Sequence, residues 1–295
     1  MIKGEVADRA RRLASERTPF VVATVVSARR PTSVRPGDGA VVHADGTIDG
    51  FVGGVCAESS VRLHSLRALE TGEPVLLRLV PGQAGGDIEA PTGGIEAATE
   101  GAVVEHNPCL SGGALEIFLE PQLPAPRIVV VGVSPIARAV RELARASGYD
   151  VADGNPREAA AVIVASHGLD EERMLVEALS SGVPYVGLVA SRLRGAAVRA
   201  ALDFPDELRA QLHTPAGLDI GARTPPEIAI SILAEIVADS RGRPRGQPAS
   251  ETDPVCGMRV SVADSAPHLD GPDGRLYFCS EHCRDAYARG HAVAS

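Results

Sequence analysis

Between residues 126 and 240, short apolar runs alternate regularly with amphipathic helical segments, a pattern that few folds can accommodate. The runs RIVVV, AAAVIVAS and PYVGLVA are rich in Val, Ala and Ile, which suits strands that are buried on both faces. Helical patterns separate these runs, and strands that are joined through helices pair in parallel. The sequence therefore predicts an α/β fold in which residues 126–240 form a Rossmann-like, doubly wound parallel sheet.

The first part of the chain has a different pattern, in which short apolar strands are joined through glycine turns. PFVVATVVSA and the hairpin-like GAVVHADGTIDG precede a helical stretch at 57–69, and PVLLRLV, GAVVEH and ALEIFLEP follow it. This pattern predicts a β-rich α+β domain at 1–122. The Pro-rich segments PQLPAPR and RGRPRGQPASET predict linkers on either side of the parallel sheet. We therefore expect domains at 1–122 and 126–240, a linker at 241–252 and a small metal-binding module at 253–295.

Composition and charge exclude several classes of partner. The chain of 295 residues has a net charge of −9, so a nucleic acid or an anionic membrane would repel it. It contains no uninterrupted apolar run of about 20 residues, the length that spans a bilayer. The segment MIKGEVADRARRLASE lacks the apolar stretch of a signal peptide, and five cysteines are an odd count for a disulfide framework. We expect a cytoplasmic protein without a membrane span or a nucleic-acid partner.

Three cysteines near the C-terminal end have the spacing of a metal site. Cys256 lies in DPVCGM, whereas Cys279 and Cys283 lie in LYFCSEHC. A strand-like run ends at Cys279, and Ser280 is the expected cap of a helix whose first turn contains Cys283. A helix N-terminus favours the thiolate, which is the form of cysteine that binds metal. Three sulfurs can occupy three corners of a tetrahedron, leaving the fourth for His282, water or a partner.

The segment 253–295 is too short for a core that is stable unaided, so a metal would also contribute folding energy. Its two cysteine motifs resemble those of the YHS domain, a small family of metal-associated modules. The resemblance implies copper or zinc at Cys256, Cys279 and Cys283. The alternative is a buried structural trio that carries no transported metal, with His282 a solvated surface residue.

Two further cysteines lie beside paired glycines. Cys56 follows a glycine pair and Val55 at the start of the predicted helix, where backbone N–H groups can bind an anion and lower a thiol pKa. Cys109 precedes a second glycine pair, ahead of a strand. Spacing alone does not distinguish such a thiol from a small buried apolar residue. The candidate binding residues of these two loops are Gly53, Gly54, Cys56, Cys109, Gly112 and Gly113.

The first turn of the parallel-sheet half has an altered dinucleotide fingerprint. RIVVVGVSPIAR gives Gly132, Ser134 and Ala137 where three glycines are usual. Ala137 preserves close packing of the helix, but Ser134 adds bulk where the backbone approaches a pyrophosphate. Asp153 follows the next strand, at the position of a ribose contact. An NAD site is therefore weakened, and a structural domain with an empty crevice is an alternative.

Further polar residues follow later strands of the same half. Ser166 and His167 follow the third strand, and Ser191 and Arg192 follow the fourth. Because the carboxyl ends of parallel strands meet at one edge of the sheet, we expect these residues at the same crevice. A satisfied structural histidine and a solvated arginine are the alternatives.

Three motifs resemble those of the XdhC/CoxI family, whose members are accessory factors for molybdenum hydroxylases. They are RPGDGAVVHADGTIDGFVGGVCAES, CLSGGALEIFLEP and LDIGARTPPEIAISILAEIVA, and the resemblance spans about residues 15–240. The second is similar to the form found in carbon monoxide dehydrogenase accessory proteins. The resemblance implies a maturation chaperone that binds molybdenum cofactor, assists its sulfuration and metal loading, and inserts it into the apo-hydroxylase.

The same resemblance implies roles for individual residues. Cys56 and Cys109 would hold molybdenum or a sulfur atom, and the glycine loops would hold the pterin phosphate. A cofactor extended as a dinucleotide would present its pyrophosphate and ribose to the crevice at Gly132, Ser134 and Asp153, and His167 would lie near this ligand.

This interpretation describes a carrier rather than an enzyme with turnover. Its expected partners are an apo molybdenum hydroxylase, a cysteine desulfurase, and a second copy of the chain in a homodimer. Carbon monoxide dehydrogenase is the hydroxylase that would explain a second metal. One alternative is an NAD(P)-dependent oxidoreductase, which would need an acid–base pair that the sequence does not offer. Another is a metal-sensing or metal-storage protein.

Overall fold

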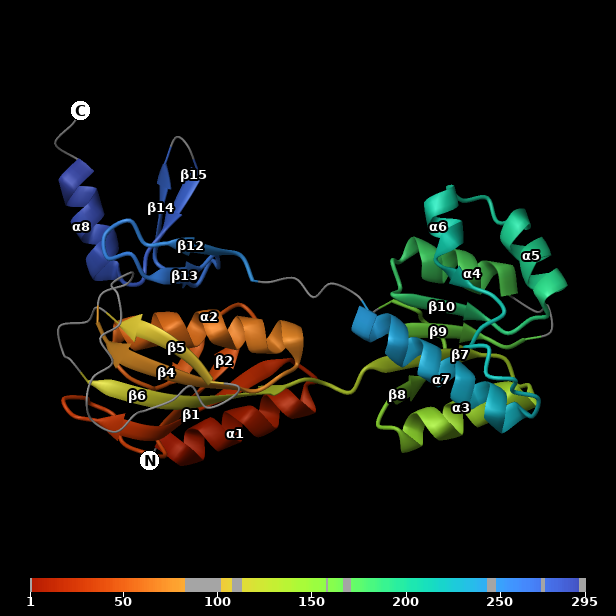
Figure 1. Cartoon of the computed structure of the whole chain (residues 1–295), viewed down its shortest axis with the longest axis horizontal. Coiled ribbons are helices and arrows are strands. Elements are labelled where there is room, and N and C mark those ends of the chain that lie inside the picture. Colours follow the sequence, from red (N-terminus) through yellow and green to blue (C-terminus); the bar gives the residue numbers. More distant parts are fainter. Residues whose placement is uncertain are drawn as a thin grey trace. The chain divides into compact units, whose positions relative to one another are not determined.

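The computed structural model describes residues 2–82, 102–107, 113–157, 159–166, 171–242, 248–271 and 274–291. The chain forms two compact units (Figure 1). Unit 1 combines Met1–Pro124 with Arg245–Ser295, and unit 2 is Ala125–Pro244. The C-terminal segment therefore packs with the N-terminal part of the chain. Among the described residues, none of the helices has the length and apolar character that a membrane crossing requires.

Unit 1 is built on a six-stranded sheet with the order β3-β2-β1-β6-β4-β5. Its neighbouring strands are antiparallel except for β4 and β5, which pair in parallel. The predicted alternation in β6 is observed, since Leu115, Ile117 and Leu119 all lie in the core. The strands are β1 (Phe20–Arg29), β2 (Gly39–His43), β3 (Ile48–Gly50), β4 (Val75–Pro81), β5 (Ala102–Asn107) and β6 (Ala114–Gln122).

Two helices lie on opposite faces of this sheet (Figure 1). Helix α1 (Ile2–Ser15) packs on β1 and β2, with Leu13 in a small core. Helix α2 (Val55–Thr71) packs on β1, β4 and β6. Buried residues surround much of α2, and they include Ser59 and Ser65 as well as Val61. Burial on more than one face follows because the C-terminal segment covers the side of α2 that faces away from the sheet.

The C-terminal segment forms a layer over α2. It has two antiparallel hairpins, β12 (Ser250–Thr252) with β13 (Arg259–Ser261) and β14 (His268–Gly271) with β15 (Gly274–Tyr277), followed by helix α8 (Glu281–His291). Strand β13 packs on α2. The hydroxyl of Ser265 donates to the backbone oxygen of Asp45 at 2.7 Å, which fixes the segment against the turn between β2 and β3.

Unit 2 has the predicted doubly wound parallel sheet, with the order β11-β10-β9-β7-β8. Helices α3 and α7 cover one face, and α4, α5 and α6 cover the other (Figure 1). The strand order reverses between β7 and β9, which creates a crevice at their carboxyl ends. The elements are β7 (Arg127–Val131), α3 (Pro135–Ala146), β8 (Asp150–Ala152), β9 (Ala161–Val164), α4 (Glu171–Ser180), β10 (Tyr185–Leu188), α5 (Arg192–Ala201), α6 (Asp206–Ala210), β11 (Leu212–His213) and α7 (Pro225–Gly242).

Candidate functional site

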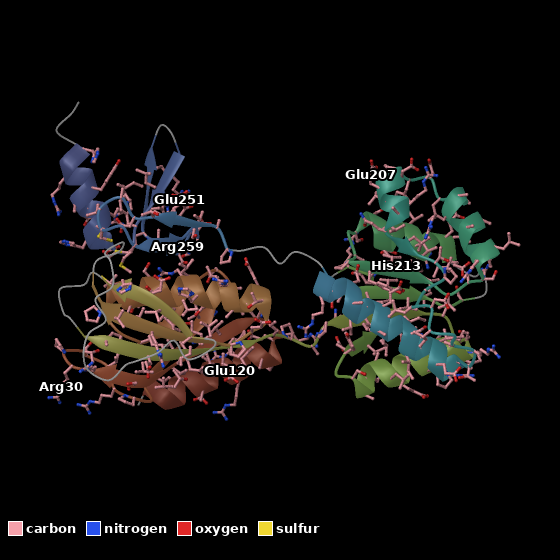
Figure 2. The ribbon with its side chains drawn as sticks, viewed as in Figure 1. Arg30, Glu120, Glu207, His213, Glu251 and Arg259 are labelled. Carbon is pink, nitrogen blue, oxygen red and sulfur yellow. The ribbon has the colours of Figure 1, made fainter. Side chains whose placement is uncertain are left out.

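The three cysteines predicted to bind metal lie together in the C-terminal segment. The sulfur of Cys279 is 3.5 Å from that of Cys256 and 3.6 Å from that of Cys283. Zinc–thiolate bonds of about 2.3 Å in a tetrahedron place neighbouring sulfurs about 3.8 Å apart, so the trio is close to ligand spacing. Figure 2 shows sulfur atoms, in yellow, near the base of α8. None of the described cysteines forms a disulfide.

Local structure brings these thiols together. Cys279 follows β15 and is buried, and Cys283 is buried in the first turn of α8. The hydroxyl of Ser280 accepts a hydrogen bond from the backbone N–H of Cys283 at 3.2 Å, as its predicted role as a cap requires. Cys256 is half-buried in the turn between β12 and β13. The turn between β12 and β13, the end of β15 and the start of α8 therefore bring the three cysteines together.

Asp253 organises the cluster, and the sequence interpretation missed it. Its Oδ1 accepts hydrogen bonds from the N–H groups of Val255 at 2.8 Å and Cys256 at 3.3 Å, and its Oδ2 accepts one from the N–H of Cys279 at 2.7 Å. Burial alone would raise the pKa of Asp253, but these donors outweigh burial and hold it below the ordinary value. The signal that could have identified it is an aspartate at the start of a turn, because its carboxylate commonly accepts a hydrogen bond from the backbone N–H two residues later.

The thiols of the cluster form hydrogen bonds with one another, and these bonds shift their pKa values. The hydrogen bond with Cys279 lowers the pKa of Cys256. The same bond, a hydrogen bond with Cys56 and burial together raise the pKa of Cys279. Burial raises the pKa of Cys283 to about 11. The thiols therefore interact with one another, and a soft cation would bind in place of their protons.

The first glycine pair lies at the N-terminus of α2, where the sequence places Cys56. Gly54 is the N-cap of this helix, and Cys56 lies half-buried in its first turn. Gly53 has a φ of +139°, and a Cβ there would lie 2.9 Å from the Cβ of Ala57, so only glycine fits. Cys56 packs against the C-terminal cysteines. The structure thus joins two candidate sites that the sequence interpretation treated separately.

The second glycine loop is described only in part. Gly113 comes so close to the backbone that a Cβ would lie 2.1 Å from the oxygen of Pro31, which explains glycine at this position. Cys109 and Gly112 lie outside the described residues, as does His167 in unit 2. Their roles stay predictions from the sequence.

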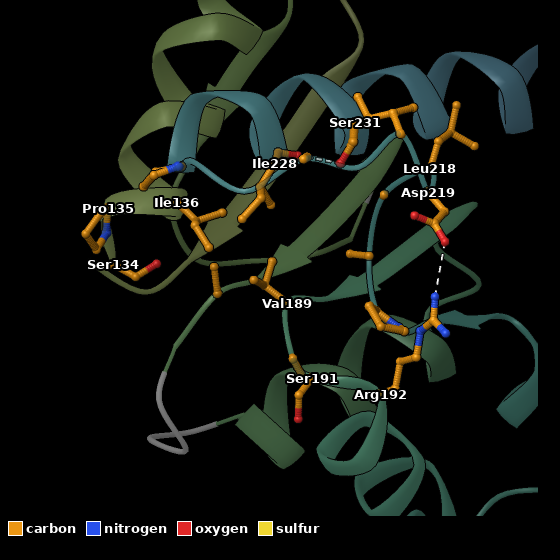
Figure 3. A pocket seen from close by; sticks show the side chains of 18 of the residues that line it. Ser134, Pro135, Ile136, Val189, Ser191, Arg192, Leu218, Asp219, Ile228 and Ser231 are labelled. Atoms are coloured by element: carbon orange, nitrogen blue, oxygen red, sulfur yellow. Dashed lines mark hydrogen bonds and ion pairs between the residues drawn. The ribbon is translucent and has the colours of Figure 1, made fainter.

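Unit 2 has a cavity of about 680 Å³ at the carboxyl ends of its strands (Figure 3). The N-termini of α3 and α5 lie at this cavity, capped by Ser134 and Ser191 respectively. The Ser166 hydroxyl also lines it and has no hydrogen-bond partner among the described residues. Arg192 extends to Asp219, with which it forms an ion pair of 3.1 Å. The helix N-termini and the hydroxyl suit a phosphate or another anion, while the charge of Arg192 is balanced by Asp219.

The fingerprint residues of unit 2 have separate positions. Ser134 lines the cavity, and its hydroxyl accepts a hydrogen bond from the N–H of Ala137 at 3.1 Å. Gly132 has a φ of +106°, and a Cβ there would lie 2.6 Å from the oxygen of Ala165. Asp153 is exposed and pairs with Arg141 at 3.3 Å. Neither Gly132 nor Asp153 is among the residues that line the cavity.

Family models match both units. Residues 13–79 match the model of the XdhC and CoxI family, and residues 128–236 match that of the XdhC Rossmann domain. The two matches cover most of the sheet and α2 in unit 1 and nearly all of unit 2. The resemblance of residues 253–295 to the YHS domain stays a prediction.

Individual relatives are also similar to the chain. Uncharacterized protein YqeB of Escherichia coli (strain K12) is 29% identical over 302 residues, which cover 91% of this chain and 52% of the relative. The chain thus spans about half the length of that relative. Molybdenum cofactor insertion chaperone PaoD of the same strain is 27% identical over 263 residues, which cover 74% of this chain and 82% of PaoD.

A solved structure described as a xanthine dehydrogenase from Bacillus halodurans is 16% identical, covering 83% of this chain and 97% of that chain with a TM-score of 0.37. This likeness is too loose to support an argument about function. The two family models, by contrast, match successive parts of the sequence and together cover more than half of it. The chain belongs to the XdhC and CoxI family.

Proposed function

We propose that the protein is an insertion chaperone that binds molybdenum cofactor and passes it to an apo molybdenum hydroxylase. The proposal is supported by family membership and by similarity to PaoD, which is named as a molybdenum cofactor insertion chaperone. The structural observation that carries it is the cavity of unit 2, where two helix N-termini meet a serine hydroxyl that has no hydrogen-bond partner within the described part of the chain.

The cavity fits the phosphate of such a cofactor. The first N–H groups of α3 and α5 have no partner within their own helices, apart from those that the capping serines satisfy. Ser166 offers a buried hydroxyl, and Arg192 lines the cavity together with Asp219, its ion-pair partner. Apolar side chains between these groups suit a flat ring system. They include Ile136, Val189, Leu218 and Ile228.

The bound cofactor would supply the redox-active molybdenum centre, and the chain would hold and shield it. Ser166 and the N-termini of α3 and α5 would bind the phosphate or pyrophosphate. The apolar residues would exclude water from the ring. This division of roles requires no acid–base pair of the polypeptide.

More specific roles extend this proposal. We propose that a cysteine desulfurase and the chain together give the cofactor its terminal sulfur, and that carbon monoxide dehydrogenase is the client. We also propose that Cys256, Cys279 and Cys283 hold copper or zinc. Their sulfur spacing and burial support a metal at this position.

The test is cofactor retention by the full chain, purified from a host that makes molybdenum cofactor. Molybdenum is measured by elemental analysis and the pterin by its fluorescent oxidation product. Arg192→Glu leaves Asp219 without its partner and adds a second carboxylate at the cavity, so repulsion of a phosphate should reduce retention roughly tenfold. Arg145→Glu is the matched control, because Arg145 is exposed in the last turn of α3, away from its capped end.

Other outcomes contradict the proposal. Wild-type protein that contains neither molybdenum nor pterin would remove it. Tight NADH binding that Arg192→Glu weakens, without pterin, would favour the NAD(P)-dependent oxidoreductase instead. Metal at the cysteines in a protein that never retains pterin would favour metal sensing or storage.

A further inference from the structure

We infer that Cys56 supplies the fourth sulfur of the C-terminal metal site, so that one soft cation joins helix α2 to the C-terminal segment. The inference rests on the metal binding proposed for Cys256, Cys279 and Cys283, and it is independent of the molybdenum cofactor. It assigns to Cys56 a ligand role that neither the spacing of the C-terminal motif nor the glycine motif indicates.

The first argument is position. Cys56 is far from the other three cysteines in the sequence, yet it packs against the cluster that contains all of them. Its thiol forms a hydrogen bond with the sulfur of Cys279, the central member of the trio. Four of the five cysteines of the chain therefore lie at one place, one from α2 and three from the C-terminal segment.

The second argument is that the other candidates for the fourth position are unsuitable. His282 is exposed to solvent, whereas Cys56 is half-buried and packs against the cysteine cluster. Asp253 belongs to that group, but its two carboxylate oxygens already accept three backbone N–H groups. Three of the roughly four lone-pair sites of the carboxylate are therefore already used, whereas none of these backbone bonds depends on the Cys56 thiol.

The third argument is electrostatic. A divalent cation with four thiolates carries a net negative charge, which a buried site must offset. Cys56 lies in the first turn of α2 and Cys283 in the first turn of α8, so two helix N-termini face the cluster. The partial positive charge at each N-terminus offsets part of the negative charge of such a site.

The fourth argument is that the junction around Cys56 is already fixed. The hydroxyl of Ser265 bonds to the oxygen of Asp45, and Arg62 of α2 donates from Nε to the oxygen of Gly46 at 2.9 Å. A Cβ at Gly46 would lie 2.6 Å from the Ser265 hydroxyl, so the turn and the segment are in close contact. Cys56 is outside the set of ligand atoms that lie within 4.8 Å of one another. Rotation of its side chain, rather than movement of the segment, would bring its sulfur to the ion.

One consequence concerns chemistry at Cys56. A thiolate bound to a cation cannot carry a sulfur atom or bind molybdenum at the same time. Metal occupancy of this site and a sulfur-carrying role for Cys56 therefore exclude each other.

The test uses the full chain and two metal probes, Zn²⁺ and Co²⁺. Zinc affinity is measured by competition with a chromophoric chelator, and the cobalt form is examined by its sulfur-to-cobalt charge-transfer absorption. Cys56→Ser should weaken zinc binding by at least about tenfold and remove about one quarter of the charge-transfer absorption, one thiolate in four. Val55→Ala, at an exposed neighbour in the same turn, should leave both unchanged. Circular dichroism of each metal-free variant tests whether it folds.

Cys56→His gives a second, independent readout. Imidazole can occupy one corner of a tetrahedral zinc site, so this variant should recover most of the zinc affinity while its cobalt spectrum stays that of three thiolates. The inference would be overturned if Cys56→Ser kept the zinc affinity and cobalt spectrum of the wild type. It would also be overturned if His282→Ala weakened zinc binding about tenfold, which would make His282 the fourth ligand. A wild-type chain that binds neither metal would overturn both the inference and the C-terminal metal site, yet leave the molybdenum cofactor proposal standing.

Discussion

Single buried polar residues position the cysteines of unit 1. Asp253 accepts hydrogen bonds from the loops of both Cys256 and Cys279, and Ser280 caps the helix that presents Cys283. Each buried N–H that lost its acceptor would cost about 1–3 kcal/mol. The thiol cluster is therefore held by backbone hydrogen bonds whether or not a cation is bound.

Gly132 shows the same dependence on one residue in unit 2. We predict that Gly132→Ala lowers the free energy of unfolding by about 2–4 kcal/mol, because the new methyl group would meet the Ala165 carbonyl at a backbone φ of +106°. Gly148→Ala is the matched control, since Gly148 also has a positive φ, +84°, but nothing lies within 4 Å of a Cβ there. It should cost only about 1–2 kcal/mol of backbone strain. Urea unfolding of both variants measures the difference, and equal losses would show that the close approach to Ala165 has no energetic cost.

At the scale of elements, α2 connects the sheet of unit 1 to the C-terminal segment. Its N-terminus contributes Cys56 to the thiol cluster, and its middle contributes His64 to a contact with Glu105 of β5. The distance from His64 Nε2 to Glu105 Oε1 is 2.9 Å, and the His64 side chain is only 5% exposed. This pair fastens the edge strand of the sheet to the helix.

The pair makes the stability of unit 1 depend on pH. The hydrogen bond with His64 lowers the pKa of Glu105, although burial opposes this effect. A carboxyl group with a lowered pKa in the folded state stabilises the fold above its unfolded pKa of about 4.3 and loses that contribution as pH falls through the folded value. Glu105→Gln should therefore cost about 1–2 kcal/mol near neutral pH, and the cost should vanish in acid.

Urea unfolding of wild type and Glu105→Gln at a series of pH values, from about 7 to about 3, measures this dependence. Glu120→Gln, at an exposed position of β6 that Figure 2 labels, should cost little at any pH. A cost of Glu105→Gln that grows on acidification would contradict the assignment.

The sequence predicted some elements much better than others. Parallel pairing in unit 2 and the cap at Ser280 follow from local patterns, and both are observed. The sequence interpretation missed α6 and β11, because elements of 5 and 2 residues contain too little periodic pattern. It also missed the meeting of Cys56 with the C-terminal cysteines, since contact between residues so far apart in the sequence has no local signature.

At the scale of the whole molecule, the C-terminal segment belongs to unit 1, where it has its own small core and packs on α2. We predict that a chain ending at Gly242 has a lower melting temperature for unit 1 and an unchanged one for unit 2, because the truncation exposes the side of α2 that β13 covers. Differential scanning calorimetry should resolve the two transitions. A chain ending at His291 controls for shortening alone. An unaltered unit 1 transition in the shorter chain would contradict this assignment.

The order of the two units along the chain has a consequence for their connection. Since unit 1 is made from both ends of the chain and unit 2 from the middle, two covalent connections join them. A protease that cut one connection would leave two fragments that stay associated, because the halves of unit 1 hold each other by burial and hydrogen bonds. The cleaved protein would then migrate as a single species under native conditions, and a denaturant would separate the two fragments.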